Sequence, residues 1–432
     1  MSAECRALIA ERIRERGAMT VAEYMDLALY HPECGYYARA SRRTGRAGDF
    51  FTSVDVGPLF GELLAVQLAE MWRILDRDQG PRAGGERQST VDSQSTVSQQ
   101  STVSQQSSVG RLGHAVAPSS REREDPRAAL FDLVEAGAGD GRLACDILDW
   151  TRLHDAAFYA AIRLHLVERS AGARAEQPRT LGPHAARLAT STDRLPSHVR
   201  GVILANELLD ALPTHLVEMT SAGLREIFVA VEDDRLVERP GAPSTPELAA
   251  HLARAGAAMR PGWRAEVSLA ATAWVRDAAQ RLERGFLLLI DYGHPAPQLY
   301  SEARASGTLA AFSRHTSPAP APGGSQPPPW LADPGSHDIT AHVDLTSVTL
   351  AAEGAGLTTL ALVDQTYFLL GLGLADRLAE SAGSARRDLE RRLALKTLML
   401  PGGLGSTHKV MIFGKGVASP PLRGRSFGAR LT

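Results

Sequence analysis

The sequence is poor in cysteine, and its few cysteines are far apart. Only 3 occur in 432 residues, namely Cys5, Cys34 and Cys145. They are too few and too scattered for a disulfide framework or a zinc site, which suits a reducing compartment. The histidines, cysteines and aspartates also show no metal-ligand spacing along the chain. We therefore predict that the functional site holds no metal.

The sequence also lacks a strong charge of either sign and any long apolar run. Its formal net charge is −2 at pH 7, which leaves no electrostatic footprint for nucleic acid. The best apolar run, residues 285–290, has the length of a strand and is far shorter than the ~20 residues of a membrane span. We predict neither nucleic-acid binding nor membrane insertion. The interleaved acids and arginines of residues 1–19 predict an amphipathic helix and not an export signal, so we expect a cytoplasmic protein.

Lysine is scarce as well, since only Lys396, Lys409 and Lys415 occur and arginine supplies nearly all the positive charge. This bias indicates a GC-rich coding sequence, and we expect a bacterial source.

A low-complexity segment interrupts the first third of the chain. Beginning at Gln88, the hexapeptides QSTVDS, QSTVSQ, QSTVSQ and QSSVGR follow one another. A six-residue period is compatible with a β-helix, but units with one valine each cannot bury a core. Because glycine, proline and charged residues flank them, a disordered insertion is the better interpretation.

Changes in composition mark the remaining boundaries. Residues 316–329 are Pro-rich, and residues 416–432 are rich in Pro, Gly and Arg. We therefore predict an N-terminal helical or lid segment at 1–75, a disordered insertion at 76–127, a core at 128–415 that contains the Pro-rich loop, and a flexible tail at 416–432.

Short apolar runs alternate with helical patterns in the core, as in the βαβ units of a parallel sheet. The expected strands are Phe131–Glu135, Arg163–Val167, Arg187–Thr190, Val202–Leu204, Phe286–Ile290 and His408–Phe413. The expected helices are Leu143–Leu153, Ser170–Thr180, Thr245–Met259 and Ser268–Leu282. Between Leu216 and Arg239, alternation such as that of IFVAV at 227–231 predicts an antiparallel β insertion. The fold class is therefore α/β.

The motif EAGAGDG at residues 135–141 follows the first expected strand and precedes a helix. This is the setting in which a glycine turn binds a nucleotide-like ligand. A dinucleotide fingerprint needs the spacing GxGxxG, but here the third glycine comes one residue early and an acid, Glu135, leads the turn. S-adenosylmethionine has no phosphate and carries an ammonium and a sulfonium. We therefore predict that Glu135, Gly137, Gly139 and Gly141 bind this cofactor.

Acidic and polar residues also follow the next strands, at the edge where ligands bind in open α/β sheets. Glu168 ends the second strand and can accept both ribose hydroxyls, although it can equally be a solvated strand-end acid. Asp193 follows the third strand, where it can meet the adenine amino group. Asn206, Glu207 and Asp210 follow the fourth strand, where the two acids can alternatively stabilise the turn.

Several stretches together resemble one family. They are YHPECGYY at 30–37, GDFFTS at 48–53 with FGEL at 60–63, the glycine turn, NELLDALP at 206–213, IDYG at 290–293, DPGSHDITAHVD at 333–344 and PGGLG at 401–405. In this order they resemble the MidA-like family, which includes the mitochondrial complex I assembly-factor methyltransferase. The resemblance covers the chain except for the repeat and the tail.

The resemblance implies a Rossmann-like, seven-stranded class I methyltransferase sheet with an N-terminal helical segment and with added β and helical insertions. It also implies that the stretch 48–53 folds near the cofactor, which makes Asp49, Thr52 and Ser53 candidate site residues. The stretch 333–344 is likewise implied to help shape the active-site region. Mitochondrial members methylate arginine on a complex I subunit, so the implied partner is a protein.

A guanidinium acceptor is cationic, since the pKa of arginine lies above 12, and carboxylates must hold it and orient one nitrogen toward the methyl group. We predict that Glu207 and Asp210 do so, followed by Asp49. Two alternatives remain: an assembly chaperone that binds the cofactor without turnover, and a dinucleotide oxidoreductase, which the glycine spacing disfavours.

Overall fold

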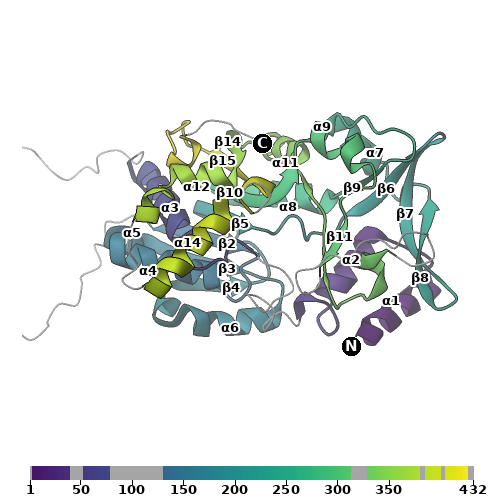
Figure 1. Ribbon diagram of the computed structural model, residues 1–432, viewed down its shortest axis with the longest axis horizontal. Helices are drawn as coiled ribbons and strands as arrows, with labels where there is room; N and C mark the ends of the chain where they lie inside the picture. Colours follow the sequence, from purple (N-terminus) through teal and green to yellow (C-terminus); the bar gives the residue numbers. More distant parts are fainter. Residues whose placement is uncertain are drawn as a thin grey trace, which may run out of the picture.

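A computed structural model describes residues 2–38, 52–77, 130–312, 328–379, 385–399 and 404–426. Asp49, the hexapeptide repeat at 88–111 and most of the Pro-rich loop at 316–329 lie outside these residues (Figure 1).

A mostly parallel sheet forms the centre of the core. It has eight strands, and seven of them follow the order β14-β15-β10-β5-β2-β3-β4. The eighth, β13 (Val343–Asp344), pairs only with β10. These strands are β2 (Phe131–Ala136), β3 (Ile162–Val167), β4 (Leu188–Thr192), β5 (Val199–Asn206), β10 (Leu282–His294), β14 (Thr358–Asp364) and β15 (His408–Lys415). Strand β15 runs antiparallel to both neighbours, and β10, β5, β2, β3 and β4 are parallel. The structure confirms the expected Rossmann-like fold.

Helices cover both faces of this sheet because alternate strand residues point to opposite sides. In β5, Val202 and Leu204 belong to one core cluster, whereas Ile203 and Ala205 belong to the other. The first cluster is closed by α3 (Leu59–Arg77), α4 (Arg142–His154) and α12 (Gln365–Gly371), and the second by α8 (Leu269–Arg281) and α11 (Leu345–Gly354). The central strands β5 and β10 are buried on both faces and are correspondingly rich in apolar residues.

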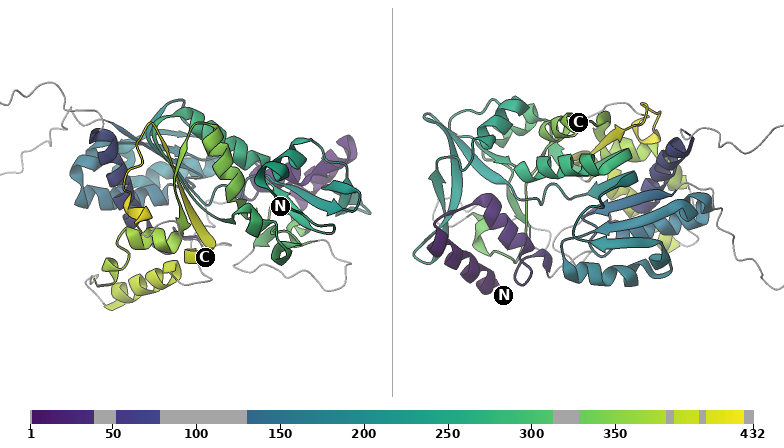
Figure 2. Two further views of the ribbon diagram at one scale, coloured as in Figure 1. Left: turned by 90° about the horizontal axis from the view of Figure 1, so that it is seen from above. Right: turned by 180° about the vertical axis from the view of Figure 1, so that it is seen from behind.

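A second, antiparallel sheet packs against the N-terminal helices at the other end of the molecule (Figures 1 and 2). It contains β1 (Met19–Thr20), β6 (His215–Thr220), β7 (Gly223–Glu232), β8 (Arg235–Gly241) and β9 (Arg264–Val267). Side chains of α1 (Ser2–Arg16) and α2 (Val21–Tyr30) share a core with β6, β7 and β8. The expected antiparallel insertion is thus present, and it joins the N-terminal segment.

The remaining elements are short or peripheral. They are α5 (Ala156–Ala161), α6 (Ala171–Leu181), η2 (Gly182–Arg187), α7 (Glu247–Ala255), α9 (Ala296–Leu299), η3 (Glu302–Arg304), β11 (Ala310–Phe312), α10 (Pro329–Ala332), β12 (Asp338–Thr340), α13 (Asp376–Ala379), α14 (Ala385–Met399), α15 (Leu404–Thr407) and η4 (Arg423–Arg425). Of the described helices, none combines the length and the apolar character that crossing a membrane requires.

The end of the chain packs on the core as far as it is described. We expected a flexible tail from residue 416, but Leu422 is buried and the amide of Gly424 donates a hydrogen bond of 3.0 Å to Gln67 Oε1 on α3. Phe368 of α12 lies against the same glycine. The described part of this segment therefore covers the groove between α3 and α12.

Strands β5 and β10 approach closely at a pair of glycines. Gly285 stands opposite Gly201 with φ +137°, and a Cβ on Gly285 would lie 1.9 Å from the Gly201 carbonyl oxygen. We expect Gly285→Ala to lower the free energy of unfolding by at least ~2 kcal/mol, because backbone strain and a backbone clash add. Gly354→Ala at the end of α11 is the control, since a Cβ there meets nothing within 4 Å. Urea denaturation of both variants measures the difference, and equal stabilities would contradict the argument.

Candidate active site

A cavity of about 210 Å³ opens at the carboxyl ends of β2, β3 and β5. It lies where the central sheet meets the N-terminal segment, because its walls also include Tyr36 and Tyr37. Most of the predicted site residues line it: Thr52, Glu135, Gly137, Gly139, Glu168, Asn206, Glu207 and Asp210. The predicted cofactor and acceptor residues therefore share one cavity.

The glycine turn forms the floor of this cavity. Gly137, Gly139 and Gly141 have φ of 72°, 52° and 87°, a region in which a side chain is strained. The amide of Gly137 donates to the Val167 carbonyl (2.9 Å), which ties the turn to the end of β3. Gly141 does not line the cavity but begins α4, where a Cβ would lie 3.1 Å from Leu166 Cδ1. The positive φ and the close approach to Leu166 thus both favour glycine at the third position of the turn.

Glu168 is fixed at the end of β3 by backbone donors. Its Oε2 accepts from the amide of Gly139 (2.9 Å) and its Oε1 from the amide of Ser170 (2.7 Å). Each carboxylate oxygen has a second lone pair for another donor. The carboxylate is therefore held rigidly on the cavity wall, oriented by the same turn that forms the floor.

Glu135 is the most unusual acid of the site. It is 5% exposed, and its Oε2 has no hydrogen-bond partner among the described residues. Burial raises the pKa of Glu135 to about 8, although a hydrogen bond from the Ala144 amide acts in the opposite direction. A buried carboxyl group without a second donor is costly. Its orphaned oxygen on the cavity wall fits a cationic or N–H-bearing group of a ligand.

Glu207 is held in a strained backbone conformation directly after β5. It has φ 50°, one of few positive values outside glycine in the described residues. Its Oε1 accepts from the Ser53 amide (3.2 Å) and from Asn206 Nδ2 (3.3 Å), and lies 3.6 Å from His408 Nε2. Within the described part of the chain, its Oε2 is left without a partner. The backbone and three neighbours thus present one carboxylate oxygen to the cavity.

Asp210 lies in the same turn and is 4% exposed. Burial raises its pKa well above the usual value, and the charge of Asp291 raises it further, whereas a hydrogen bond with Tyr292 lowers it. Its Oδ1 has no hydrogen-bond partner among the residues that the structure covers.

Asp291 supports this turn from the neighbouring strand β10. It accepts from the amides of Leu209 (2.8 Å) and Tyr292 (2.9 Å). Burial raises the pKa of Asp291 to about 7. The turn therefore carries Glu207 and Asp210, and Asp291 of β10 holds its backbone in place.

The segment before α3 closes one side of the cavity. Thr52 donates to Asp55 Oδ2 through its amide (3.0 Å) and its hydroxyl (3.1 Å), and Asp55 pairs with Arg142 at the start of α4. Ser53 is fully buried and reaches the site only through its hydrogen bond to Glu207. Asp49 lies outside the described residues, and Asp193 is exposed and does not line the cavity.

The opposite wall is formed by tyrosines of the N-terminal segment and by the stretch 333–344, which the resemblance implies to be near the site. Asp338 of β12 lines the cavity and accepts from the Tyr37 hydroxyl (2.8 Å), and Tyr37 stacks on Tyr30 with ring centroids 5.2 Å apart. Both segments belong to stretches that carry the family resemblance, but their spacing along the chain gives no sign that they meet.

Three comparisons place this geometry among known proteins. A family model described as S-adenosyl-L-methionine-dependent methyltransferase matches residues 112–363. The mitochondrial protein arginine methyltransferase NDUFAF7 of Mus musculus is 27% identical over 397 residues, which are 85% of this chain and 73% of the relative. The Drosophila melanogaster homologue is 26% identical over 444 residues, covering 95% and 85%. A Burkholderia thailandensis protein solved with bound S-adenosyl-homocysteine is 28% identical, with TM-score 0.77 and coverage of 99% and 96%.

Proposed function

We propose that this chain, which belongs to the family of S-adenosyl-L-methionine-dependent methyltransferases, is a protein arginine methyltransferase. In this proposal it transfers the methyl group of the cofactor to an arginine side chain of a protein. The names of the mitochondrial relatives support the arginine acceptor. The observation that carries the proposal is a single cavity in which Glu207 and Asp210 each present one buried carboxylate oxygen without a partner in the described chain.

The cofactor half of the cavity fits the charges of S-adenosyl-L-methionine. In the proposal, Glu135 accepts a hydrogen bond from the ligand or faces its positive charge, and Glu168 accepts from the ribose hydroxyls. Gly137 and Gly139 let the backbone approach the ligand closely. Asn206, whose Oδ1 has no partner among the described residues, also lines the cavity. Asp193 remains a predicted contact of the adenine ring.

The acceptor half fits a planar cation with several N–H donors. A guanidinium can donate to two carboxylates at once in a fixed geometry, and Glu207 Oε2 and Asp210 Oδ1 are the acceptors for it. Tyr36 and Tyr37 line the same space, and an aromatic face stabilises a guanidinium. Asp49 remains a third predicted acid.

The bound cofactor supplies an electrophilic methyl group, so the new N–C bond forms as the S–C bond breaks. The residues of the chain hold the guanidinium, orient one nitrogen in line and remove a proton from it. Asp210 is suited to take this proton, because its raised pKa makes it a stronger base than an exposed carboxylate. Glu207, held by Ser53, Asn206 and His408, keeps the guanidinium in place.

Methyl transfer should increase with pH between about pH 6 and 8. A carboxyl group whose pKa is raised is protonated below that pKa, and only its ionised form can accept a proton or hold a cation. Burial raises the pKa of Asp291 to about 7, and the charge of Asp291 raises the pKa of Asp210. The two carboxyl groups together therefore gain negative charge over this range. The pH profile of kcat/KM with saturating cofactor measures this, and a profile that is flat or falls over the range would contradict it.

The experiment that tests the function compares protein-bound methylarginine in the source organism with and without the gene. We expect the loss of at least one methylarginine, restored by the wild-type gene but not by Glu207→Gln. Purified protein should then methylate the extract of the deletion strain with labelled cofactor. Cofactor binding without transfer to arginine would instead favour an assembly chaperone. A respiratory complex subunit as acceptor and a cytoplasmic location remain parts of this proposal that rest on the sequence.

A further inference from the structure

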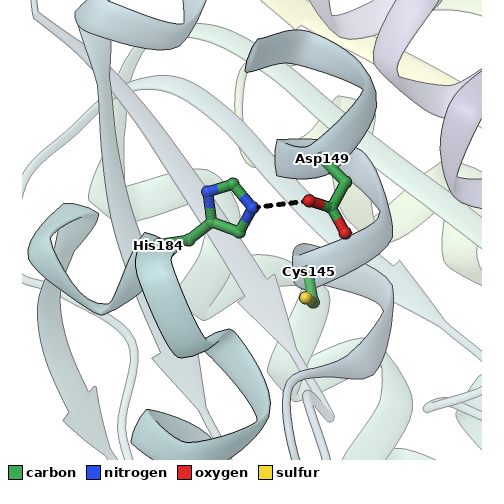
Figure 3. A group of neighbouring side chains, drawn as sticks. All are labelled: Cys145, Asp149 and His184. Atoms are coloured by element: carbon green, nitrogen blue, oxygen red, sulfur yellow. Dashed lines mark hydrogen bonds and ion pairs between the residues drawn. The ribbon is translucent and has the colours of Figure 1, made fainter. Parts of the chain in front are cut away.

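A cysteine, an aspartate and a histidine converge between α4 and η2 (Figure 3). Cys145 and Asp149 lie one helical turn apart, and His184 approaches from η2. One potential ligand atom from each lies within 4.8 Å of the other two. The three side chains do not line the cofactor cavity. In the sequence, His184 is too distant from α4 for this cluster to be recognised.

The chemistry of these donors is that of a zinc site. Thiolate, imidazole and carboxylate are all zinc ligands, with bonds of about 2.0–2.3 Å. A tetrahedral ion with such bonds holds its ligand atoms roughly 3.5 Å apart, so small side-chain rotations bring the three atoms to one ion. His184 Nε2 and Asp149 Oδ1 are already 3.0 Å apart.

The imidazole of His184 has a second hydrogen-bond partner, as a metal-ligating histidine usually does. His184 is fully buried, and its Nδ1 lies 2.9 Å from the Tyr159 hydroxyl. When Nδ1–H donates to this hydroxyl, the Nε2 lone pair points toward Cys145 and Asp149, as in many zinc sites. The Tyr159 ring also contacts His184 edge-on, with centroids 5.6 Å apart. The imidazole is therefore held in the orientation that binding requires.

We propose that Cys145, Asp149 and His184 bind one zinc ion, with water in the fourth position. The side chain of Asp149 is 55% exposed and Cys145 is partly exposed, so an ion can enter from solvent. The ion links α4, the helix that follows the glycine turn, to η2, which follows α6. Because the amide of Cys145 donates to the Gly141 carbonyl (3.0 Å), the zinc site begins one helical turn from the cofactor loop.

Two competing interactions set the conditions for binding. Arg152 lies 3.6 Å from Asp149 Oδ1, but this ion pair is exposed and therefore weak. Burial raises the pKa of the Cys145 thiol to about 11, and the charge of Asp149 acts in the same direction. Zinc has to displace the thiol proton, so the affinity should rise between pH 6 and 8.

The test uses the full chain without a histidine tag, stripped of metal and titrated with Zn²⁺ and with Co²⁺. We expect one ion per chain and a thiolate-to-cobalt charge-transfer band in the near ultraviolet. Cys145→Ser should lose the band. Cys34→Ser is the matched control and should keep it, although the Cys34 sulfur also lies near a histidine, 3.4 Å from His31 Nδ1. Tyr159→Phe should weaken zinc binding by roughly tenfold or more.

A second measurement needs no variant. Zn²⁺ should slow the alkylation of Cys145 in the wild-type chain, followed by mass spectrometry of its peptide, and should leave the rate at Cys34 unchanged. Cofactor affinity serves as the check that Cys145→Ser folds, since this side chain is outside the cavity. A cobalt band that survives Cys145→Ser, or an alkylation rate that zinc does not change, would show that the cluster is only a hydrogen-bonded Asp–His pair beside a thiol.

Discussion

Replacement of Glu135 by glutamine is expected to stabilise the ligand-free protein and to weaken its binding of S-adenosyl-L-methionine. The carboxyl group is buried with one oxygen unpartnered in the described structure, and its pKa of about 8 lies well above the ordinary 4.5. The pKa of this carboxyl group is higher in the folded than in the unfolded chain. Its contribution to the free energy of unfolding is therefore fully present below the unfolded pKa and is lost as the pH rises through the folded pKa. At pH 7–8 the variant should therefore gain about 2–3 kcal/mol.

In the complex, the positive charge of the ligand favours the ionised form of Glu135, and the substitution removes this negative charge. We therefore expect the affinity to fall roughly hundredfold, which corresponds to about 3 kcal/mol. Thermal unfolding between pH 4.5 and 8, together with calorimetric titration of the cofactor, measures both effects. The stability gain should disappear near pH 4.5, where the wild-type carboxyl group is also neutral.

Glu266 provides a matched control for Glu135. It is equally buried, and burial raises its pKa, but its oxygens accept hydrogen bonds from the Thr308 amide and hydroxyl and from the Leu309 amide. Glu266→Gln should therefore not stabilise the protein and should leave cofactor affinity unchanged. Stabilisation by both variants would mean that burial alone, and not the unpartnered oxygen, determines the effect.

Glu207→Gln and Asp210→Asn should each lower kcat of methyl transfer by about 10²–10⁴-fold while changing cofactor affinity by little. Loss of a positioned proton acceptor or of one preorganised charge costs this much. The conservative replacements keep the size of the side chains, which matters because Glu207 stands at φ 50° and is bonded by Ser53 and Asn206.

Single-turnover transfer with saturating cofactor separates the chemical step from binding. Glu218→Gln is the control, since Glu218 lies on β6 outside the cavity in a partly buried pair with Arg264. Unchanged single-turnover rates in both acid variants would remove Glu207 and Asp210 from the proposed mechanism.

The parts of the site that the sequence could predict are those in which strand, turn and ligand-facing residue are adjacent in the chain. The glycine turn with Glu135, the strand-end Glu168 and the turn with Glu207 and Asp210 all belong to this kind. A parallel sheet brings such residues together automatically, because the carboxyl ends of its strands share one edge. The expected strands and helices of the core were accordingly confirmed, with differences mainly at their ends.

Other residues reach the site through long-range packing that local patterns do not show. Tyr37 and Asp338 are separated by 301 positions yet joined by a hydrogen bond of 2.8 Å. Asp291 belongs to the motif IDYG, but only the pairing of β10 with β5 shows that it holds the turn of Glu207. The positive φ of Glu207 has no sequence signal either, since this conformation normally favours glycine. Such contacts depend on tertiary structure, which local patterns do not encode.

The position of β15 has a consequence for how the protein is made. This strand lies between β14 and β10, and among the described strands β14 has no other neighbour in the sheet. While the ribosome is still adding residues before His408, β10 and β14 expose open edges that can pair with other chains. Cotranslational folding can thus assemble the glycine turn early, but the sheet closes only after β15 has been synthesised. Premature termination upstream of β15 should therefore yield an aggregation-prone fragment.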